Sequence, residues 1–277
     1  MKLPFKADLS DKTVAVTGGG GVLMSEFAAS LAECGARVAV LDINYTAARS
    51  VSDRIGERAF AVECDCLDKS SVILARERIR EKWGKVNLLI NGAGGNAKAA
   101  TCDNEYMQKE LDPDTKSFFD LDTDGLRFVF DLNIMSAFIV TQVFAEDMVK
   151  DGGNIINISS MNAYRPLTKI PAYSAAKAGI SNFTQWLSVH FAPCNIRVNA
   201  IAPGFFVTNQ NRDLLFDADG NPTPRTDKIL NATPFGRFGR PEELIGTLLY
   251  LACDEASSFV TGTVIAVDGG FNAYSGV

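Results

Sequence analysis

The sequence predicts an α/β protein built on a doubly wound, parallel sheet of about seven strands flanked by helices. Three observations indicate this class. Short apolar runs alternate with helical patterns to the end of the chain, a cluster of glycines follows the first run, and an acidic residue ends the second. Strands that alternate with helices join into parallel sheets through right-handed crossovers.

Each predicted strand is rich in valine, isoleucine and alanine. The runs are Thr13–Thr17, Arg37–Leu41, Ala59–Val62, Val86–Ile90, Ile155–Ile158, Val198–Ile201 and Val264–Val267. A helical pattern from Leu23 to Cys34 follows the first strand, and further helices are expected to begin near Tyr45 and Ala172. Because the chain contains no repeat, low-complexity tract or linker, we expect one domain over residues 1–277.

A nucleotide-binding pattern opens the chain. Gly18-Gly19-Gly20-Gly21 lies between the first strand and the first helix. Glycines let the backbone turn tightly and approach a pyrophosphate at the helix N-terminus. The second strand leads to Asp42, near the ~20 residues downstream at which a dinucleotide fingerprint has an acid. A glycine run alone is usually a plain loop, but this order of strand, glycines, helix, strand and acid predicts a dinucleotide site.

Asp42 also predicts which dinucleotide binds. A carboxylate at this position accepts hydrogen bonds from the ribose hydroxyls of NAD and repels the 2′-phosphate of NADP. No arginine or lysine stands in the glycine run to hold that phosphate. We therefore expect NAD rather than NADP. The alternative, that Asp42 caps the helix near Tyr45, is compatible with the same role.

Tyr173 and Lys177 lie four residues apart in a predicted helix, so they project from one face. An ammonium beside a phenol favours the phenolate, which lowers a pKa that starts near ~10. Such a base takes a hydroxyl proton at neutral pH. Ser160, after the strand-like run 154–158, is placed to hold the same substrate oxygen. A surface Tyr/Lys pair is the alternative, and the preceding nucleotide pattern argues against it.

These motifs, in this order, resemble those of the short-chain dehydrogenase/reductase family over nearly the whole chain. Thr17-Gly18 and the glycines after it resemble the family motif TGxxxGxG. Asp65 resembles the acid that touches adenine, and Asn91-Gly92-Ala93-Gly94 resembles the NNAG that supports the central sheet. Pro203-Gly204 resembles the turn beside the nicotinamide. The resemblance implies a single-domain Rossmann-type fold.

The resemblance also implies a catalytic set and a cofactor site. The catalytic residues are expected to be Asn133, Ser160, Tyr173 and Lys177. The cofactor-binding residues are expected to be Thr17, Gly18, Gly19, Gly20, Gly21, Val22, Leu23, Asp42, Asp65, Cys66, Asn91, Gly92, Ala93, Tyr173, Lys177, Pro203, Gly204 and Phe206. Tyr173 would exchange a proton with the substrate oxygen as hydride passes between the same carbon and the nicotinamide. Lys177 would also bond the nicotinamide ribose, and Asn133 would anchor a proton-relaying water.

Two departures from the family pattern concern the phosphate loop. The glycines expected at positions 22 and 24 are Val22 and Met24, whereas Gly20 and Gly21 come earlier. The last family glycine permits close strand–helix packing, so Met24 bears on the geometry of the loop. Asn91 is followed by Gly92 instead of a second asparagine.

The substrate prediction comes from a narrower resemblance. Residues 92–96, 158–169, 203–212 and 267–277 resemble those of the short-chain-type D-mannonate oxidoreductases, which interconvert D-mannonate and D-fructuronate. A polyhydroxy acid needs a cation for its carboxylate and amides for its hydroxyls. The substrate-binding candidates are Asn96, Ser160, Asn162, Arg165 and Asn209, with Lys169 as a second cation and Gln210 as a further amide. A solvated loop charge is the alternative for Arg165.

The sequence is also compatible with other functions. Within enzymes, the alternatives are a reductase of another keto-sugar acid, such as a keto-gluconate, or of a 3-oxoacyl thioester. Outside enzymes, a dinucleotide-binding sensor or scaffold would keep the fold and lose catalysis. Such proteins usually have a broken catalytic set, and all four polar positions are present here.

The composition argues against several classes of partner. The 277 residues are 47% hydrophobic and carry a net charge of -6, without a basic stripe, which argues against nucleic acid. No apolar run reaches the ~20 residues of a membrane span, and Met1 to Lys12 lacks a signal-peptide core. Six scattered cysteines and one histidine predict reduced thiols and no metal site. We expect a cytoplasmic enzyme of a small sugar acid, and by analogy a homotetramer or homodimer.

Two polar segments, near 96–124 and 205–241, interrupt the alternation of strands and helices. Each follows a predicted strand. Ligands of open α/β sheets bind outside the carboxyl ends of the strands. We therefore expect these two segments to shape the substrate site.

Overall fold

The computed structural model describes residues 7–208 and 212–276, without the side chains of residues 213 and 214. Its strands form one parallel sheet in the order β3-β2-β1-β4-β5-β6-β7. They are β1 (Thr13–Thr17), β2 (Arg37–Asp42), β3 (Ala59–Glu63), β4 (Leu88–Asn91), β5 (Gly153–Ile158), β6 (Ile196–Pro203) and β7 (Val264–Val267). The predicted seven-stranded α/β sheet is confirmed.

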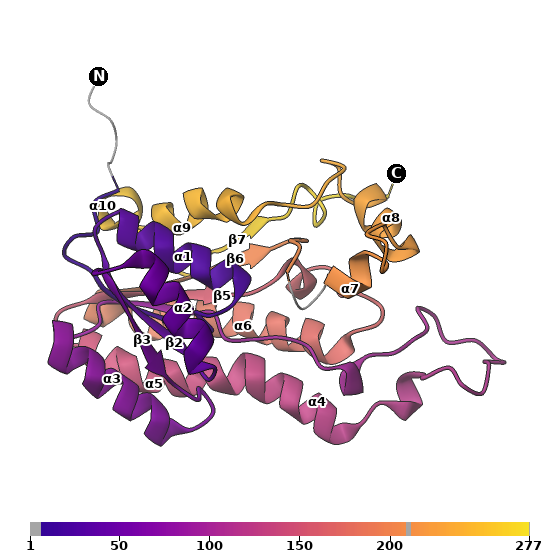
Figure 1. Cartoon of the computed structure of the whole chain (residues 1–277), viewed down its shortest axis with the longest axis horizontal. Coiled ribbons are helices and arrows are strands. Elements are labelled where there is room, and N and C mark those ends of the chain that lie inside the picture. Colours follow the sequence, from indigo (N-terminus) through magenta and orange to yellow (C-terminus); the bar gives the residue numbers. More distant parts are fainter. Residues whose placement is uncertain (1–6, 209–211, 277) are drawn as a thin grey trace.

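Helices cover both faces of the sheet (Figure 1). They are α1 (Val22–Glu33), α2 (Tyr45–Ile55), α3 (Lys69–Trp83), α4 (Thr123–Phe130), α5 (Ser136–Met148), α6 (Pro171–His190), α7 (Arg212–Leu215), α8 (Pro224–Asn231), α9 (Ile245–Ala252) and α10 (Asp254–Ser257). One apolar layer joins α1, α2 and α9 to the sheet, and the other joins α3, α5 and α6 to it.

Alternation along β1 explains why both layers form. Val14 and Val16 point into the layer with α1, whereas Ala15 points into the layer with α3 and α5. Successive side chains of a strand face opposite sides of the sheet, so a strand buried on both faces must be apolar throughout. All five residues of β1 are buried.

The strand order places the site. The chain builds β1, β2 and β3 outward, and then returns to lay β4 against the other side of β1. Strand order therefore reverses between β1 and β4, and ligands of such sheets bind at the carboxyl ends of the strands beside this point. The loops after β1, β4, β5 and β6 all leave that edge.

The helical stretch Thr123–Met148 has an unusual centre. A π turn, Asp131–Met135, separates α4 from α5. This stretch is the one helix in the described chain with the length and hydropathy of a membrane span, and half of its most apolar window is buried in the protein. Val140, Phe144 and Met148 are at most 1% exposed. Such burial is typical of the core helix of a globular fold.

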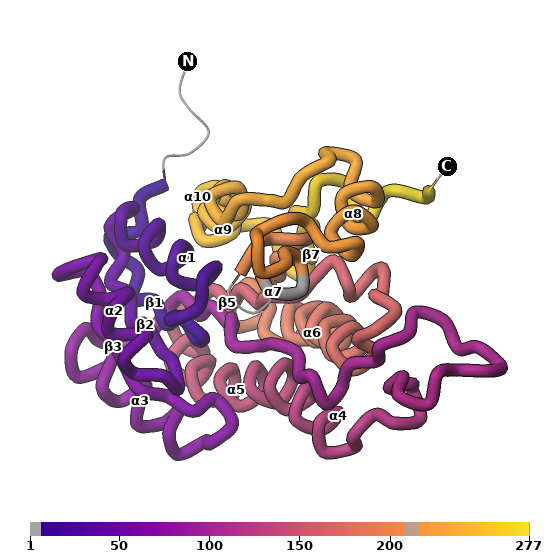
Figure 2. Tube along the Cα trace, turned by 45° about the vertical axis from the view of Figure 1, so that its right-hand side comes forward, coloured from indigo at the N-terminus to yellow at the C-terminus, as the bar shows by residue number. Residues whose placement is uncertain are grey.

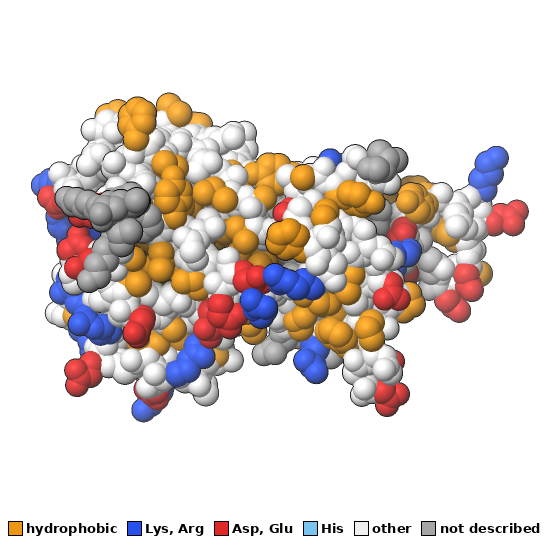
Figure 3. Space-filling view, turned by 90° about the horizontal axis from the view of Figure 1, so that it is seen from above, with side chains coloured by type: hydrophobic (Ala, Val, Ile, Leu, Met, Phe, Trp, Pro, Cys, Tyr) orange, Lys and Arg blue, Asp and Glu red, His pale blue; other side chains and the backbone are white. Residues whose placement is uncertain are grey.

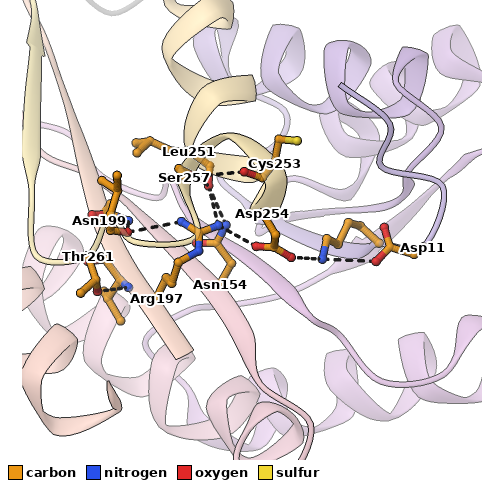
Figure 4. A network of polar contacts seen from close by, with 12 residues as sticks. Asp11, Asn154, Arg197, Asn199, Leu251, Cys253, Asp254, Ser257 and Thr261 are labelled. Carbon is orange, nitrogen blue, oxygen red and sulfur yellow. Dashed lines mark hydrogen bonds and ion pairs between the residues drawn. The ribbon is translucent and has the colours of Figure 1, made fainter. Parts of the chain in front are cut away.

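A charged network closes the opposite, amino edge of the sheet (Figure 4). Arg197, at the start of β6, donates to the carbonyl oxygen of Leu251 at 3.0 Å and to Asp254 Oδ1 at 2.8 Å. Lys12, just before β1, donates to Asp254 Oδ2 at 2.6 Å. The network therefore joins β1, β6 and the turn between α9 and α10.

Two long segments extend the carboxyl edge (Figures 1 and 2). One joins β4 to α4, and the other joins β6 to α9 and contains α7 and α8. In both views they lie at the same end of the molecule as the start of α6. Seen from above, acidic and basic side chains are interspersed on the visible face (Figure 3).

Candidate active site

Three polar side chains meet where β5 ends and α6 begins. Ser160 follows β5 directly, and Tyr173 and Lys177 occupy the first two turns of α6. Pro171 stands at the start of α6, where its missing N–H costs no helical hydrogen bond. Ser160 lies close enough to the Tyr173 phenol to affect its pKa. The structure therefore brings together the serine, tyrosine and lysine that the sequence singled out.

Burial controls the protonation of Tyr173. Removal from water raises the pKa of the phenol, and the polar interaction with Ser160 lowers it by a smaller amount. The expectation that Lys177 lowers this pKa is not met in the structure. The lysine ammonium lies 5.7 Å from the centre of the tyrosine ring, and desolvation dominates.

Lys177 is itself buried, with 4% of its surface exposed. Its Nζ donates a 2.8 Å hydrogen bond to the carbonyl oxygen of Ile158, the last residue of β5. Burial disfavours the ammonium and lowers the pKa of Lys177 to about 8. Lys177 thus places a titratable cation beside Tyr173.

Asn133 holds the loop after β4. It lies in the π turn, and its Nδ2 donates to the carbonyl oxygens of Gly95 at 2.7 Å and Val129 at 2.8 Å. Its Oδ1 accepts from the Gly95 N–H at 3.2 Å. A Cβ on Gly94 would lie 2.7 Å from that Oδ1 and 3.1 Å from Lys177 Nζ. Asn133 and Lys177 therefore flank the same glycine, and the water relay implied by the family resemblance stays a prediction.

The π turn was missed from the sequence. A π turn inserts one residue into a helix and is often found at functional sites. No residue pattern in 131–135 marks it, since the run Asp-Leu-Asn-Ile-Met reads as ordinary helix. Only the helix register around Asn133 reveals it.

The glycine loop approaches neighbouring backbone closely. Gly18 has φ +64°, and a Cβ there would lie 3.0 Å from Ala93 Cα. The Gly20 N–H donates to Asp42 Oδ2 at 3.0 Å, and the Asn44 N–H donates to Oδ1 at 2.9 Å. Asn44, not Asp42, caps α2 by accepting from the Ala47 N–H. Asp42 therefore lies beside the loop, with lone pairs left for further donors.

Met24 and Gly92 complement each other. A Cβ on Gly92 would lie 2.6 Å from Met24 Cγ and would also contact the Met24 sulfur. The Met24 side chain is 5% exposed and occupies the space that a side chain at position 92 would need. Two of the departures from the family pattern, Met24 and Gly92, thus form one packing unit. Sequence reasoning treated them separately.

Thr17 ties the same unit together. Its Oγ1 accepts from the N–H groups of Gly92 at 3.0 Å and Ala93 at 3.2 Å. Asn91, the last residue of β4, donates from Nδ2 to Asn157 Oδ1 at 2.8 Å and to Thr141 Oγ1 at 3.0 Å. The predicted motif at Asn91–Gly94 is therefore tied to the neighbouring elements by buried and partly buried hydrogen bonds.

A cavity of about 220 Å³ lies at the carboxyl ends of β2 and β3. Its lining comprises Ile43, Glu63, Asp65, Ser71, Leu74, Ala75 and Arg78. The mixture of apolar walls with polar groups, among them the carboxylates of Glu63 and Asp65, suits a nucleobase. Ile43, Leu74 and Arg78 were missed because nothing in their local pattern marks them. Predicted Cys66 is buried, shares a hydrogen bond with Cys64, and is not in the lining.

A second cavity, of about 240 Å³, lies beyond β6 and β7. Phe206, a predicted cofactor residue two positions after Gly204, is 4% exposed and forms part of its wall. Arg237 also lines it and is paired with Glu243 at 2.7 Å. Pro203 ends β6, so the predicted turn does leave the carboxyl edge.

The predicted substrate residues have different surroundings. Arg165 is exposed, and its Nε donates to the carbonyl oxygen of Asn272 at 3.1 Å, which ties its loop to the C-terminal segment. Asn96 is exposed and donates to Thr101. Asn162 is 4% exposed, its N–H donates to Ser160 Oγ, and its Oδ1 has no partner. Asn209 and Gln210 lie outside the described residues.

Metal and thiol chemistry have no assembled site in the described part of the chain. No group of three or more histidine, cysteine, aspartate or glutamate side chains that could hold a metal occurs among the described residues. All six cysteines are free thiols. His190 stacks on Trp186 with ring centres 4.5 Å apart, consistent with a structural role.

Comparison with known proteins identifies the family. A family model described as enoyl-(acyl carrier protein) reductase matches residues 24–272. The chain belongs to the short-chain dehydrogenase/reductase family. This agrees with the order of the motifs and with the positions of Ser160, Tyr173 and Lys177 at the edge of the sheet.

Three members of this family illustrate the similarity. Uncharacterised oxidoreductase UxuB of Bacillus subtilis is 50% identical over 279 residues, which cover 99% of this chain and 100% of the relative. A solved structure from Haemophilus influenzae, named as a proposed D-mannonate oxidoreductase with bound NAD, is 53% identical with a TM-score of 0.94 and covers 98% of each chain. 2-Dehydro-3-deoxy-D-gluconate 5-dehydrogenase of Dickeya dadantii is 33% identical, covering 96% of this chain and 97% of the relative.

Proposed function

We propose that this oxidoreductase interconverts D-fructuronate and D-mannonate with NAD(H). The observation that carries the proposal is the meeting of Ser160, Tyr173 and buried Lys177 at the sheet edge beside a dinucleotide loop. The similarity to the Haemophilus influenzae structure supports the choice of substrate.

The residues at the carboxyl edge fit NAD. Gly18 brings backbone close to the loop after β4, Asp42 offers a carboxylate at the end of β2, and the cavity with Asp65 suits the adenine. Asp42 favours NAD over NADP, because a second negative charge would be repelled there. When bound, NAD(H) supplies the hydride donor or acceptor of the reaction.

In the reductive direction, Tyr173 gives its proton to the carbonyl oxygen of the substrate. The raised pKa of the phenol keeps it protonated at neutral pH, as a general acid requires. Ser160 holds the same oxygen and stabilises the charge that develops on it. Lys177 keeps a cation next to the pair, held by the carbonyl oxygen of Ile158. The oxidative direction needs the phenolate and is favoured at higher pH.

A second candidate is reduction of another keto-sugar acid. The 33% identity to a 2-dehydro-3-deoxy-D-gluconate 5-dehydrogenase favours this alternative over a 3-oxoacyl thioester. Both sugar-acid reactions use the same proton and hydride steps. They differ in the contacts to hydroxyl and carboxylate groups, which the segments 96–124 and 205–241 supply in this proposal.

The test is NADH consumption with D-fructuronate, 5-keto-D-gluconate and an acetoacetyl thioester. We expect D-fructuronate to have the highest kcat/KM. Tyr173→Phe should lower kcat about 10²- to 10⁴-fold while NADH still binds, because only the transferred proton is removed. D-fructuronate as the poorest of the three substrates would contradict the substrate, and near-full turnover of Tyr173→Phe would contradict the mechanism. Tight NADH binding without turnover on all three would favour the sensor alternative.

We also propose that the chain forms a homodimer or homotetramer. Apolar side chains stay exposed on α5 and α6, including Phe138 at 36%, Trp186 at 57% and Val189 at 77%. Phe138 and Trp186 both stack on Phe183, so they form one continuous surface, typical of an interaction site. Light scattering on the eluting protein measures the mass, and a monomer would refute the proposal. A cytoplasmic location stays a further proposal, supported by the free thiols.

A further inference from the structure

The two segments that leave β4 and β6 meet each other. Lys228 of α8 donates from Nζ to Glu105 Oε1 at 2.8 Å, which joins the 205–241 segment to the 96–124 segment. The Cys102 N–H donates to the carbonyl oxygen of Lys169 at 2.9 Å. Lys169 stands four residues before Tyr173. The meeting point therefore lies next to the start of α6.

Three cations act on the carboxylate of Glu105 at this meeting point. The pKa of Glu105 is lowered, first by the hydrogen bond from Lys228 and then by the nearby charges of Lys169 and Arg225. Lys228 forms the direct ion pair with Glu105, so Lys169 and Arg225 act on it only from a distance. Such a site favours an anion.

Arg225 is the cation best placed to bind one. It lies three residues before Lys228 on α8, so both project from one face of that helix. Its side chain is half-buried, and burial lowers its pKa. Within residues 7–208 and 212–276 its guanidinium forms no hydrogen bond or ion pair, since Lys228 already holds Glu105. A half-buried arginine without a partner retains its capacity for a carboxylate.

The position of α8 is fixed by its own contacts. The Thr226 hydroxyl donates to the carbonyl oxygen of Leu215 at 2.5 Å, and Ile229 is 7% exposed. Thr223 caps the helix by accepting from the Thr226 N–H. Arg225 therefore projects from a helix held on both sides, whereas Arg165 is exposed and bonded to Asn272.

We infer that Arg225, assisted by Lys169, binds the carboxylate of the sugar-acid substrate. The inference rests on the proposed function and replaces Arg165 as the principal cation. Arginine presents two parallel N–H donors to a carboxylate, and lysine adds a point charge. Because Lys228 is paired with Glu105, this carboxylate does not compete with a substrate carboxylate for Arg225. The two cations then select substrates by their negative charge.

The test compares Arg225→Gln with the wild type on D-fructuronate and on D-fructose, which has the same skeleton with a hydroxymethyl group in place of the carboxylate. We expect the KM for D-fructuronate to rise about 10- to 100-fold, because a charged hydrogen-bonded pair is lost. The KM for D-fructose and the affinity for NADH should not change. Arg225→Lys should give a smaller rise, since it keeps the charge and loses the fork. Arg127→Gln, an exposed arginine on α4, is the matched control and should match the wild type.

A binding measurement separates this inference from the proposed function. Calorimetry compares D-mannonate with D-mannitol on the NADH-bound protein, with and without Arg225. If the wild type does not reduce D-fructuronate, the proposed function fails, and Arg225-dependent binding of D-mannonate still supports the anion site. A KM change below threefold for a substrate that is turned over, an equal effect on D-fructose, or D-mannonate affinity independent of Arg225 would overturn the inference.

Discussion

Burial governs the two side chains at the centre of the site. Tyr173 keeps its proton because desolvation raises its pKa, and Lys177 holds its proton less firmly because desolvation lowers its pKa to about 8. The pKa of Tyr173 thus lies above, and that of Lys177 below, the value of the same side chain in water. Such opposed shifts are typical of acid–base sites. The lowered pKa of Lys177 also costs the folded state stability at neutral pH.

Lys177→Met tests that cost. At neutral pH the folded protein must bury a charged ammonium, and the shift from 10.5 to about 8 corresponds to roughly 3 kcal/mol. Loss of the bond to Ile158 offsets about 1 kcal/mol of the gain. We expect the variant to be inactive and about 2 kcal/mol more stable at pH 7 in urea unfolding.

The pH dependence of the stability of Lys177→Met tests whether burial of the ammonium is the cause. A lysine whose folded pKa is lowered destabilises the protein fully below that pKa, and the penalty disappears as the pH rises from about 8 toward 10.5. The advantage of Lys177→Met should therefore shrink between pH 7 and pH 10. Lys150→Met, at an exposed position, should show neither the gain nor its pH dependence. A less stable Lys177→Met protein at pH 7 would contradict burial as the dominant effect.

At the scale of elements, α1 and β4 are matched through Met24 and Gly92. Close approach of helix and strand normally requires a glycine on the helix. Here the thioether of Met24 occupies the space above Gly92, so the missing side chain lies on the strand side instead. Thr17 holds the same backbone from β1. Helix α1 and strand β4 therefore keep a close spacing, with the large residue on the helix and the glycine on the strand side.

A double-mutant cycle tests this match. Gly92→Ala should cost about 1–3 kcal/mol through overpacking, and Met24→Ala about 2–5 kcal/mol through a cavity. In the double variant the new methyl group enters the space left by methionine. We expect its cost in denaturant unfolding to fall at least about 1 kcal/mol short of the sum. Recovery should be partial, because a Cβ on Gly92 would also lie 2.7 Å from the Thr17 carbonyl oxygen.

Gly246→Ala is the control for this cycle. Gly246 lies in α9, and a Cβ there would meet nothing within 4 Å. Alanine at this position should leave stability unchanged or raise it by up to about 1 kcal/mol through helix propensity. Additive costs at positions 24 and 92 would show that the two residues do not pack as a unit.

At the scale of the whole molecule, the two edges of the sheet have separate tasks. The carboxyl edge carries the exchangeable loops and the polar site, while the amino edge is closed by the ion pairs of Arg197 and Lys12 with Asp254 (Figure 4). Arg197 is 7% exposed, so its charge depends on these partners. Stability and chemistry are therefore separable by mutation.

Asp254→Asn should cost about 1–2 kcal/mol of stability without changing kcat/KM. Burial of Asp254 raises its pKa, but the hydrogen bonds from Lys12 and Arg197 outweigh burial and leave the pKa below its ordinary value of 3.8. A carboxyl group with a lowered folded pKa stabilises the protein above the unfolded value and loses that contribution as the pH falls through the folded value. The difference from the wild type should thus be constant between pH 5 and pH 9 and shrink below about pH 4.

Thermal unfolding across this pH range measures the difference. Asp53→Asn, whose exposed carboxylate faces Arg49 at 3.6 Å, is the matched control and should cost less than about 0.5 kcal/mol. Equal stability of Asp254→Asn and the wild type at pH 7, or a loss of turnover in the folded variant, would contradict the separation of the two edges.

The sequence by itself determined the sheet and the order of its strands in the chain, and it singled out Ser160, Tyr173 and Lys177 as the candidate site. Alternation, glycine spacing and the Tyr173–Lys177 interval are local properties, and local patterns can be read without coordinates. The single-domain organisation and the site roles stay predictions. The tertiary structure alone decided what depends on distant contacts. It paired Met24 with Gly92, opened the π turn around Asn133, bound Arg165 to Asn272, and brought Arg225 to Glu105 across more than a hundred residues. Charge, burial and packing at these positions come from neighbours far away in the chain, so no local pattern marks them.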